Sequence, residues 1–444
     1  MSNLDKIKAA GVVGAGGAGF PTHVKLAAQA EVVIANGAEC EPLLRVDQQV
    51  MERYAAEVVR GMQIAVALTG AVRGVICLKE KYKQAVSNLQ SALNGVANIT
   101  LQLIDNYYPA GDEQALVYEV TGRVVPVGGI PIHAGAVVLN VSTLVGITNA
   151  VDKSTPVTHK YVTITGAVER PTTVQVPIGT PIRRLIAHAK GPAESGDYAV
   201  ILGGPAMGAV TTDWDTPVTK ILGGIIVLPT THSLIGKKTA PLENQIRLSR
   251  SVCCQCNQCT MLCPRNTLGL GTSPHKAMRA LAYGKGDGLP PEEIVSCCEC
   301  GICTYFACNM ELMPHRIMGK LKGEFLRNKV PFEKRESRGA SDERPYKNLP
   351  TARMITRLGL KKYDVPAPME DGILPIERVK IPLKQHIGAP CTACVTVGQA
   401  VTAGDAIGTV AEGQLGSPVH TGISGVVTAV TDTHIEIQAK GGTS

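Results

Sequence analysis

Three short apolar runs in the first 110 residues predict buried strands. They are VVI at 32–34, GVICL at 74–78 and ITLQLI at 99–104. The stretch between the second and the third, KEKYKQAVSNLQSAL at 79–93, has the composition of a helix. A strand, a helix and a strand in this order form a β-α-β unit. We therefore expect residues 1–155 to form an α/β domain.

The hydrophobic pattern changes near residue 160. The segments YVTITGAV at 161–168 and TTVQVPIGT at 172–180 alternate with a period of two, and PIRRLIAHA at 181–189 supplies a short helix. Two strands followed closely by a helix indicate a small α+β module of β-grasp character. We expect this module to span residues 156–244.

The rest of the chain divides into three segments by composition. Residues 245–330 are rich in cysteine and have helical flanks. The stretch 331–348 is charged, poor in apolar residues and contains two prolines, so we expect a linker at 331–372. From 373 to 444, short β-rich runs are punctuated by glycine, which predicts a small sandwich or barrel.

Length and charge exclude several classes of protein. A chain of 444 residues holds about three domains with cores of their own. The net charge of +7 is mild, and no basic run with interleaved aromatic residues indicates nucleic-acid binding. The first ten residues lack the apolar core of a secretory signal, and runs such as IIVL at 225–228 are far shorter than the ~20 residues of a membrane span. We expect a cytoplasmic protein without a transmembrane segment.

The stretch GVVGAGGAGFPTHVKL at 11–26 has five glycines within nine positions. Glycines let a ligand lie against backbone N–H groups, and a helix that begins after such a loop favours phosphate. Gly14, Gly16 and Gly19 also match the dinucleotide spacing G-x-G-x-x-G, although that pattern should follow a strand and only VV precedes it. A phosphate-binding loop and a plain flexible turn both fit this stretch when it is taken alone.

Ten of the fourteen cysteines lie between residues 253 and 308, in two groups of five. So many cysteines in an intracellular chain argue against a disulfide framework. Cys253 begins the spacing C-x2-C-x2-C-x3-C-P, and the same register restarts at Cys297. In two-cluster ferredoxins each such run lends its last cysteine to the other cluster. One [4Fe–4S] cluster is thus expected on Cys253, Cys256, Cys259 and Cys308, and the other on Cys297, Cys300, Cys303 and Cys263.

The second run departs from this pattern. Four residues, TYFA, separate Cys303 from Cys308, and Asn309 stands in place of proline, so the role of Cys308 is open. Cys254 and Cys298 each follow a first ligand directly, and we expect them to pack away from the clusters. The alternative is a pair of structural zinc sites, but zinc prefers two C-x2-C pairs separated by a longer loop. We therefore predict an electron-transfer protein.

Four segments resemble, in the same order, the FMN and NADH site of the flavin-bearing subunit of respiratory complex I: GAGGAGFPTHVK (14–25), NGAECEP (36–42), YPAGDEQAL (108–116) and LNVSTL (139–144). They are more similar still to the C subunit of the Rnf electron-transport complex. Residues 163–182 resemble the soluble-ligand-binding β-grasp module of both families. In Rnf C subunits the sandwich domain comes first, whereas here it is C-terminal. This order, the TYFA insertion and the absence of a long C-terminal extension resemble the cobalamin reductases of propanediol-utilisation microcompartments.

The resemblance implies a multidomain α/β protein. Its parts would be a Rossmann-like FMN/NADH domain, the β-grasp module, a ferredoxin-like segment with two [4Fe–4S] clusters and a C-terminal barrel-sandwich hybrid domain. It implies an enzyme that oxidises NADH and reduces cobalamin towards Co(I), to reactivate vitamin B12 for a diol dehydratase. Implied partners are a cobalamin adenosyltransferase and the shell proteins of a bacterial microcompartment that would enclose it. An electron conduit similar to Rnf C is the alternative function.

The resemblance also implies cofactor-binding residues. The FMN cradle would comprise Gly14, Gly16, Lys25, Asn36, Glu39, Cys40, Tyr108, Gly111, Asp112 and Asn140. In it, Lys25 would neutralise the phosphate. Phe20 would stack on the nicotinamide, and Glu41 and Glu113 would bind the ribose or amide of NADH. The sequence has Ala38 where complex I has an aspartate, and Ala28 where it has an adenine-stacking phenylalanine.

Other candidate residues favour structural roles. Cys391 and Cys394 form a lone C-x2-C without a second pair. His275 and His315 each stand beside a proline after a cysteine run, and packing explains them as well as cobalt ligation does. The sequence contains no D-x-H-x-x-G corrinoid motif, so it does not indicate where cobalamin binds.

Overall fold

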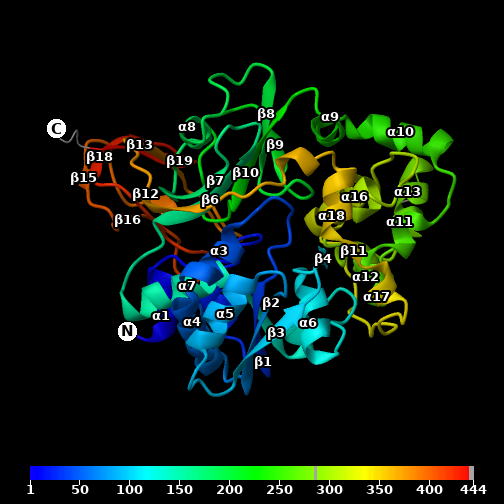
Figure 1. Ribbon diagram of the computed structural model, residues 1–444, viewed down its shortest axis with the longest axis horizontal. Coiled ribbons are helices and arrows are strands. Elements are labelled where there is room, and N and C mark those ends of the chain that lie inside the picture. The colour runs from blue at the N-terminus through cyan, green and yellow to red at the C-terminus, as the bar shows by residue number, and fades with distance from the viewer. Residues whose placement is uncertain (285–287, 440–444) are drawn as a thin grey trace.

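A four-stranded parallel sheet with the strand order β3-β2-β1-β5 forms the centre of the N-terminal domain (Figure 1). The computed structural model describes residues 1–284 and 288–439. It contains the predicted strands and the helix between them, which confirms the β-α-β unit. The bounds are Val32–Gly37 for β1, Arg73–Lys79 for β2, Ile99–Ile104 for β3, Ala136–Asn140 for β5 and Lys83–Ala92 for the helix α5.

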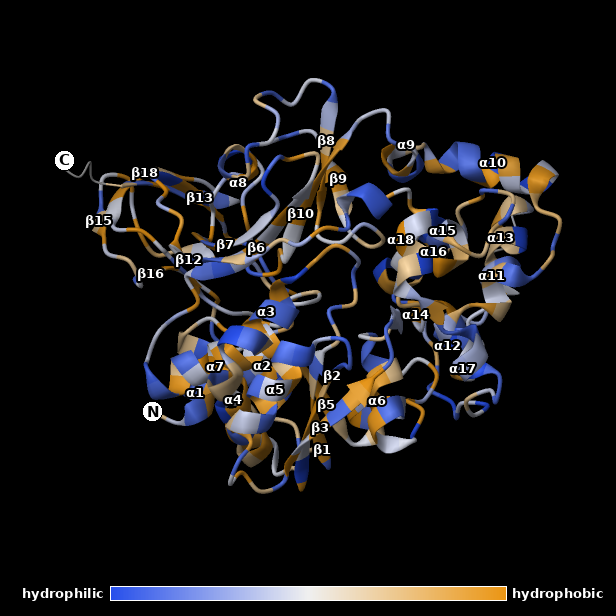
Figure 2. Cartoon of the chain, viewed as in Figure 1, coloured by the Kyte–Doolittle hydropathy of each residue, from blue (hydrophilic) through white to orange (hydrophobic). Residues whose placement is uncertain are grey.

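Helices cover both faces of this sheet. Side chains alternate along each strand, so Val33 and Ala35 of β1 enter one core, whereas Val32 and Ile34 enter the other. Strands buried on both faces are rich in apolar residues, and Figure 2 shows the sheet between helices that carry both hydrophobic and hydrophilic residues. The first core includes residues of α1 (Asn3–Ala9), α2 (Thr22–Leu26), α3 (Val46–Arg53), α4 (Ala55–Thr69), α5 and α7 (Val141–Asp152). The second includes residues of α6 (Glu113–Thr121) and the 3₁₀ helix Pro131–Ala134.

Helix α1 precedes the glycine-rich loop 14–19. Val13 makes an isolated β-bridge with Pro21, and helix α2 after the loop has five residues. The dinucleotide fingerprint needs a strand before its glycines and a helix of ordinary length after them. The loop is therefore built differently from a Rossmann phosphate loop, although the domain has the same layers.

The second module is a six-stranded sheet in the order β12-β7-β6-β10-β8-β9. Helix α8 packs on it through Ile182, Leu185 and Ile186. The predicted strands at 161–168 and 172–180 correspond to β6 and β7, and the predicted helix to α8, so the α+β module is confirmed. The bounds are His159–Gly166 for β6, Thr172–Pro177 for β7, Ile182–His188 for α8, Tyr198–Leu202 for β8, Ala209–Thr211 for β9, Gly224–Pro229 for β10 and Met369–Ile373 for β12.

The cysteine-rich segment is helical and lies beside α6 and β4 (Tyr107–Tyr108) (Figure 1). Met278, Ile317 and Leu321 form part of its own small core. Helix α9 (Ser233–Thr239) leads into the segment, whose helices are α10 (Leu242–Val252), α11 (Gln258–Met261), α12 (Pro264–Thr267), α13 (Pro274–Ala282), α14 (Pro291–Val295), α15 (Ile302–Tyr305) and α16 (Pro314–Arg327).

The segment 331–372, for which composition predicts a linker, packs along the other parts of the chain. Arg335 pairs with Glu292 of α14, and Arg344 pairs with Glu119 of α6. The charges that suggest a linker are thus used in contacts between modules. The elements here are α17 (Arg344–Lys347), β11 (Leu349–Pro350), which pairs with β4 (Tyr107–Tyr108), α18 (Thr351–Arg357) and the 3₁₀ helix Lys361–Tyr363.

The C-terminal part is a small two-sheet sandwich, which confirms the predicted architecture. Its sheets have the strand orders β13-β19-β18-β15 and β14-β16-β17. Val379, Ile407, Val419 and Ile437 belong to the shared core. The bounds are Arg378–Pro382 for β13, Thr392–Ala393 for β14, Ala400–Val401 for β15, Ala406–Thr409 for β16, Val419–His420 for β17, Gly425–Val430 for β18 and His434–Ala439 for β19.

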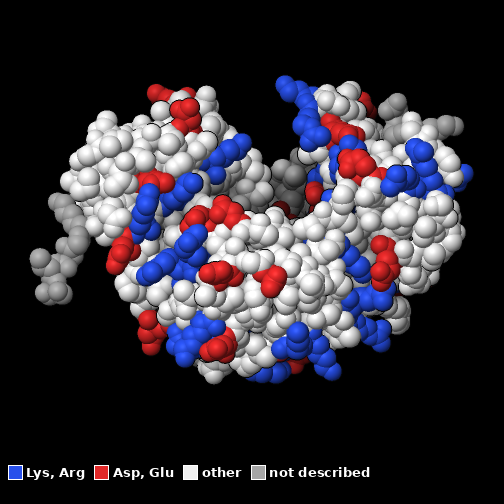
Figure 3. Space-filling view, turned by 90° about the horizontal axis from the view of Figure 1, so that it is seen from above, with Lys and Arg blue, Asp and Glu red and all other residues white. Residues whose placement is uncertain are grey.

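The surface carries charges of both signs. On the face shown in Figure 3, Lys and Arg side chains are interspersed with Asp and Glu. Among the residues that the structure describes, no helix has both the length and the apolar character needed to cross a membrane.

Candidate functional site

Two asparagines lie on neighbouring strands at the carboxyl edge of the parallel sheet. Asn36, the residue before the last of β1, pairs in register with Asn140, which ends β5. The helices that follow β1 pack on one face of the sheet, whereas helix α6, which precedes β5, packs on the other face. The pair therefore marks the topological switch point, where open α/β sheets bind their ligands. The Asn36 side-chain amide donates to the Gly111 carbonyl at 2.9 Å, which brings the segment 108–112 to the same edge.

The glycine-rich loop lies over this edge. The Gly14 N–H donates to the Phe20 carbonyl at 3.0 Å and closes the loop. A Cβ atom on Gly16 would lie 2.7 Å from the side-chain nitrogen of Asn140, so a side chain there would displace the asparagine. A Cβ on Gly17 would meet no atom within 4 Å. The loop therefore presents bare backbone next to open space, which suits a ligand that binds backbone N–H groups.

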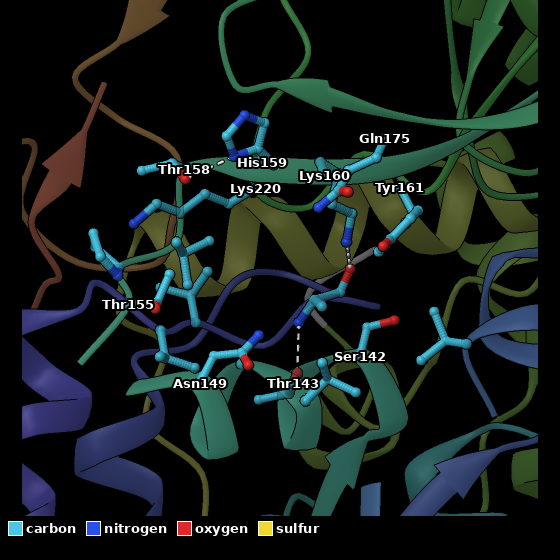
Figure 4. A pocket seen from close by; sticks show the side chains of 18 of the residues that line it. Ser142, Thr143, Asn149, Thr155, Thr158, His159, Lys160, Tyr161, Gln175 and Lys220 are labelled. Carbon is cyan, nitrogen blue, oxygen red and sulfur yellow. Dashed lines mark hydrogen bonds between the residues drawn. The ribbon is translucent and has the colours of Figure 1, made fainter. Parts of the chain in front are cut away.

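Ala15 is held from both sides (Figure 4). Its N–H donates to Thr143 Oγ at 3.0 Å, and its carbonyl accepts from Lys160 Nζ at 3.0 Å. Burial lowers the pKa of Lys160 to about 8. Behind the loop, a cavity of about 170 Å³ separates this domain from the β-grasp module, and Lys160 and Tyr161 line it. The loop is thus fixed by the second module.

Two acidic side chains form a pair beside Asn140. The backbone N–H of Asp47 donates to the Glu39 carboxylate, and the Asp47 carboxylate accepts from Asn140 at 2.7 Å and from Ser142 at 3.2 Å. Burial and the neighbouring Asp47 charge raise the pKa of Glu39 to about 8. Sequence reasoning missed Asp47, because an acid in the first turn of a helix is common for electrostatic reasons alone.

Lys25 reaches the same edge from α2. Its ammonium donates to the Val138 carbonyl at 2.6 Å and to Glu113 at 3.0 Å. The Cys40 thiol accepts a hydrogen bond from the Gly111 N–H at 3.2 Å, and burial raises its pKa to about 12, which favours the protonated thiol.

Glu41 and Tyr108 are turned towards the neighbouring modules. The Tyr108 hydroxyl lies 2.6 Å from the Cys300 carbonyl and 2.9 Å from Glu41 Oε1. The other Glu41 oxygen accepts from the backbone N–H groups of Ala206 at 2.8 Å and Met207 at 3.3 Å, in the β-grasp module. Burial raises the pKa of Glu41. Tyr108 thus connects the predicted flavin pocket directly to the cysteine-rich segment.

Asp112 makes the second connection between these parts. Arg265 donates to its carboxylate from Nε at 2.8 Å and from Nη2 at 2.5 Å, and both side chains are at most 10% exposed. A third donor of Arg265 bonds the Ser296 carbonyl at 3.0 Å. Asp112 also caps helix α6 through the Ala115 N–H at 3.3 Å. Its carboxylate therefore joins two modules, and Arg265 was not singled out from the sequence.

Eight cysteines form two groups, which we name by their surroundings. The outer group is Cys253, Cys256, Cys259 and Cys308, which together line one small cavity. Burial and the charges of the other three thiols raise the pKa of Cys259 to about 12. The inner group is Cys263, Cys297, Cys300 and Cys303. Burial and the charges of Cys297 and Cys263 raise the pKa of Cys303. The Cys298 side chain, burial and the charges of Cys263 and Cys303 raise the pKa of Cys300, so the four thiols of this group are neighbours.

The insertion before Cys308 does not remove that residue from the outer group. The expectation that Cys298 packs away from the cluster is wrong, because its side chain contacts Cys300 and is half-buried in the same apolar cluster. Cys254 is exposed and lines the same cavity as the outer thiols. Among the residues that the structure describes, no three His, Cys, Asp or Glu side chains converge as they would on a single metal ion.

The two cysteine runs repeat the same local structure. Gln255 and Glu299, two residues after the first cysteine, have φ values of 56° and 57°, and Asn257 and Gly301 follow with 65° and 77°. These left-handed residues turn the chain around the thiols.

A threonine–histidine pair supports each repeat. Thr260 Oγ lies 2.8 Å from His275 Nδ1, and Thr304 Oγ lies 2.8 Å from His315 Nδ1. The histidines therefore brace the loops, as the packing explanation predicts.

Family models match four parts of the chain in the expected order. They are the Nuo51 FMN-binding domain at residues 7–149, the SLBB domain at 161–210, the 4Fe-4S dicluster domain at 252–313 and the RnfC barrel sandwich hybrid domain at 360–443. The chain is thus an FMN and iron–sulfur protein with two [4Fe–4S] clusters.

Relatives match over different lengths. The chain is 42% identical to the cobalamin reductase PduS of Salmonella typhimurium over 98% of this chain and 95% of that protein. It is 36% identical to the C subunit of the Na⁺-translocating ferredoxin:NAD⁺ oxidoreductase complex of Acetobacterium woodii, over 57% of this chain and 56% of that one. A solved NAD⁺-reducing [NiFe]-hydrogenase in the H2-reduced state matches at 20% identity and a TM-score of 0.47, over 73% of this chain and 61% of that one. The chain belongs to the family of the cobalamin reductase PduS.

Proposed function

We propose that this chain oxidises NADH at bound FMN and delivers the electrons singly, through two [4Fe–4S] clusters, to cobalamin. The observation that carries the proposal is the 42% identity with a cobalamin reductase over nearly the whole of both chains. A flavin is needed between the two ends because NADH gives two electrons at once, whereas iron–sulfur clusters and cobalt accept one at a time. Bound FMN would supply this conversion.

The residues at the sheet edge fit FMN. The bare backbone of the loop, the open space at Gly17 and the paired Asn36 and Asn140 provide polar contacts around a flat ligand. An ammonium group has three donors, and Lys25 uses two of them on Val138 and Glu113, which leaves one for the phosphate. Asp47 orients Asn140 and is a positioning residue.

We assign the cofactor-binding residues accordingly. FMN is bound by Gly14, Gly16, Lys25, Asn36, Glu39, Cys40, Tyr108, Gly111, Asp112 and Asn140, and NADH by Phe20, Glu41 and Glu113. Within these sets Glu41, Tyr108 and Asp112 act by positioning, because their side chains bond to the neighbouring modules. The cluster ligands are Cys253, Cys256, Cys259 and Cys308, and Cys263, Cys297, Cys300 and Cys303.

We also propose the division of the chain and its setting. The modules are residues 1–155, 156–244, 245–330 and 373–444, with 331–372 as the connection between the last two. The setting is the interior of a propanediol-utilisation microcompartment, with shell proteins and a cobalamin adenosyltransferase as partners. The identity with PduS supports this setting.

The test is an assay of anaerobically purified protein. We expect non-covalent FMN, about eight irons, the sum for two cubane clusters, and NADH-dependent reduction of cob(III)alamin, followed by its absorbance. Full cluster content without flavin would contradict the proposal. It would favour the electron conduit instead, for which the 36% identity with an Rnf-type C subunit is the supporting observation.

A further inference from the structure

The two cysteine groups differ in exposure. The inner thiols Cys263, Cys297, Cys300 and Cys303 are 7%, 8%, 7% and 7% exposed. In the outer group Cys256 is exposed, and the other three are half-buried. Because the two repeats share the same local fold, the difference comes from what covers each of them.

The inner group is covered by the flavin pocket. Cys300 shares an apolar cluster with Cys40 and Tyr108, both from the predicted pocket. The Tyr108 hydroxyl lies 2.6 Å from the Cys300 carbonyl. Arg265, two residues after Cys263, holds Asp112 of the pocket through a buried ion pair. Side-chain contacts thus lead from the pocket to two of the inner cysteines.

The outer group is open to solvent. Cys254 and Cys256 are both exposed. Met261 and Met310, beside the outer thiols, are 42% and 44% exposed, although methionine is usually buried. Met310 lines the same cavity as the outer thiols.

We propose that the cluster site formed by the inner cysteines would receive electrons from the flavin pocket, and that the site formed by the outer cysteines would deliver them to the acceptor at the surface around Cys256. This inference deepens the proposed function. Each NADH loses a hydride, which carries two electrons, and becomes NAD⁺. Two cob(III)alamin molecules each take one electron and become cob(II)alamin, and one proton is released to water.

The first experiment compares Cys256→Ser with Cys300→Ser, and uses Cys394→Ser, an exposed cysteine in the C-terminal sandwich, as the control. Each cluster variant should lose about four of about eight irons and one of two EPR signals.

The rate measurement reduces FMN with light and EDTA as the electron donor, so it needs neither NADH nor cobalamin. In Cys256→Ser the remaining signal should appear at the wild-type rate. In Cys300→Ser the remaining signal belongs to the outer group, and it should appear at least about tenfold more slowly than in the wild type, after the flavin has bleached. Equal rates in the two variants would overturn the proposal.

The second experiment uses the wild-type protein, so it does not depend on the folding of a variant. An iron chelator is added together with iodoacetamide, and alkylated peptides are identified by mass spectrometry over time. Alkylation at Cys253, Cys256, Cys259 and Cys308 should precede alkylation at the inner four. Simultaneous alkylation or the reverse order would overturn the inference, whereas failure of the cobalamin assay alone would count against the proposed function.

Discussion

The two cysteine repeats have the same internal geometry and different neighbours. Both turn around their thiols with left-handed residues, and both are braced by a threonine–histidine pair. The second repeat is packed against the flavin pocket, and burial lowers the pKa of its His315 to about 3. The first repeat leaves Cys254 and Cys256 exposed.

This difference shows that two repeats with the same local structure can form similar metal sites that serve different roles. Cluster potential and access depend on burial and hydrogen bonding around the sulfurs. In this chain those conditions are set by Tyr108, Glu41 and Asp112, which lie more than 100 residues before the cysteines. Changes at the inner contacts should therefore have larger effects than matched changes at the outer ones.

The largest effect is expected for Arg265→Met. The substitution leaves the Asp112 carboxylate buried without its partner, and breaking a buried pair in this way costs about 3–5 kcal/mol of unfolding free energy. The measurement is denaturant unfolding, with iron content as a second readout. The control is Lys237→Met, whose ion pair with Glu311 near the outer group is partly exposed and should contribute about 0–1 kcal/mol. A similar loss of unfolding free energy in both variants would contradict the expected difference between the inner and the outer group.

Lys25→Ala should separate the flavin from both clusters. A charge-assisted contact with phosphate contributes roughly 1.5–3 kcal/mol, so FMN affinity should fall roughly ten- to hundredfold. Iron content should stay at about eight per chain, because the Lys25 ammonium bonds to Val138 and Glu113 and to neither cysteine group. Flavin and iron assays on the same sample measure both quantities. Unchanged flavin content would exclude Lys25 from the site.

Tyr108→Phe tests the inner contact itself. It leaves the buried Cys300 carbonyl without this donor, which costs about 1–3 kcal/mol. Gln255→Ala is the matched change at the outer group, where the amide donates to Cys253 Sγ at 3.1 Å in an exposed position, and we expect no more than about 0.5 kcal/mol. Thermal unfolding measures the melting temperature of each variant. Equal decreases in the two variants would contradict the expected difference between the inner and the outer group.

Much of the fold was predictable from local sequence. The strands β1 and β2 are buried on both faces, so they carry continuous apolar runs, and β6 and β7 show their alternation directly. The edge strand β3 was also found from its apolar residues, although Thr100 and Leu103 are exposed. The cysteine spacing and the four flavin-site segments indicated the site because they are contiguous motifs. The packed segment 331–372 was not predicted, since its arginines find their acids in other modules.

Two residues missed at the site, Arg265 and Lys160, have partners that are remote in sequence. Arg265 and Asp112 are separated by 153 positions, and Lys160 and Ala15 by 145. In the sequence, Arg265 resembles an ordinary surface charge after a proline, and Lys160 occupies a polar position of an alternating strand. Only the assembled modules bring these groups together, so no local pattern could assign them.

Per pH unit, the smallest change is a pH dependence of the unfolding free energy that should belong to the flavin side alone. The pKa of Glu39 is raised from its ordinary value to about 8, first by burial and then by Asp47. Between about pH 4.5 and 8 the folded protein keeps a proton that the unfolded chain releases, so unfolding free energy falls as pH rises, by at most about 1.4 kcal/mol per pH unit. Partial exposure of Glu39 reduces the slope. Glu39→Gln should remove it, as measured by urea unfolding from pH 5 to 8, while the iron content at each pH stays that of the wild type. A slope that persists in the variant would assign the titration to another group.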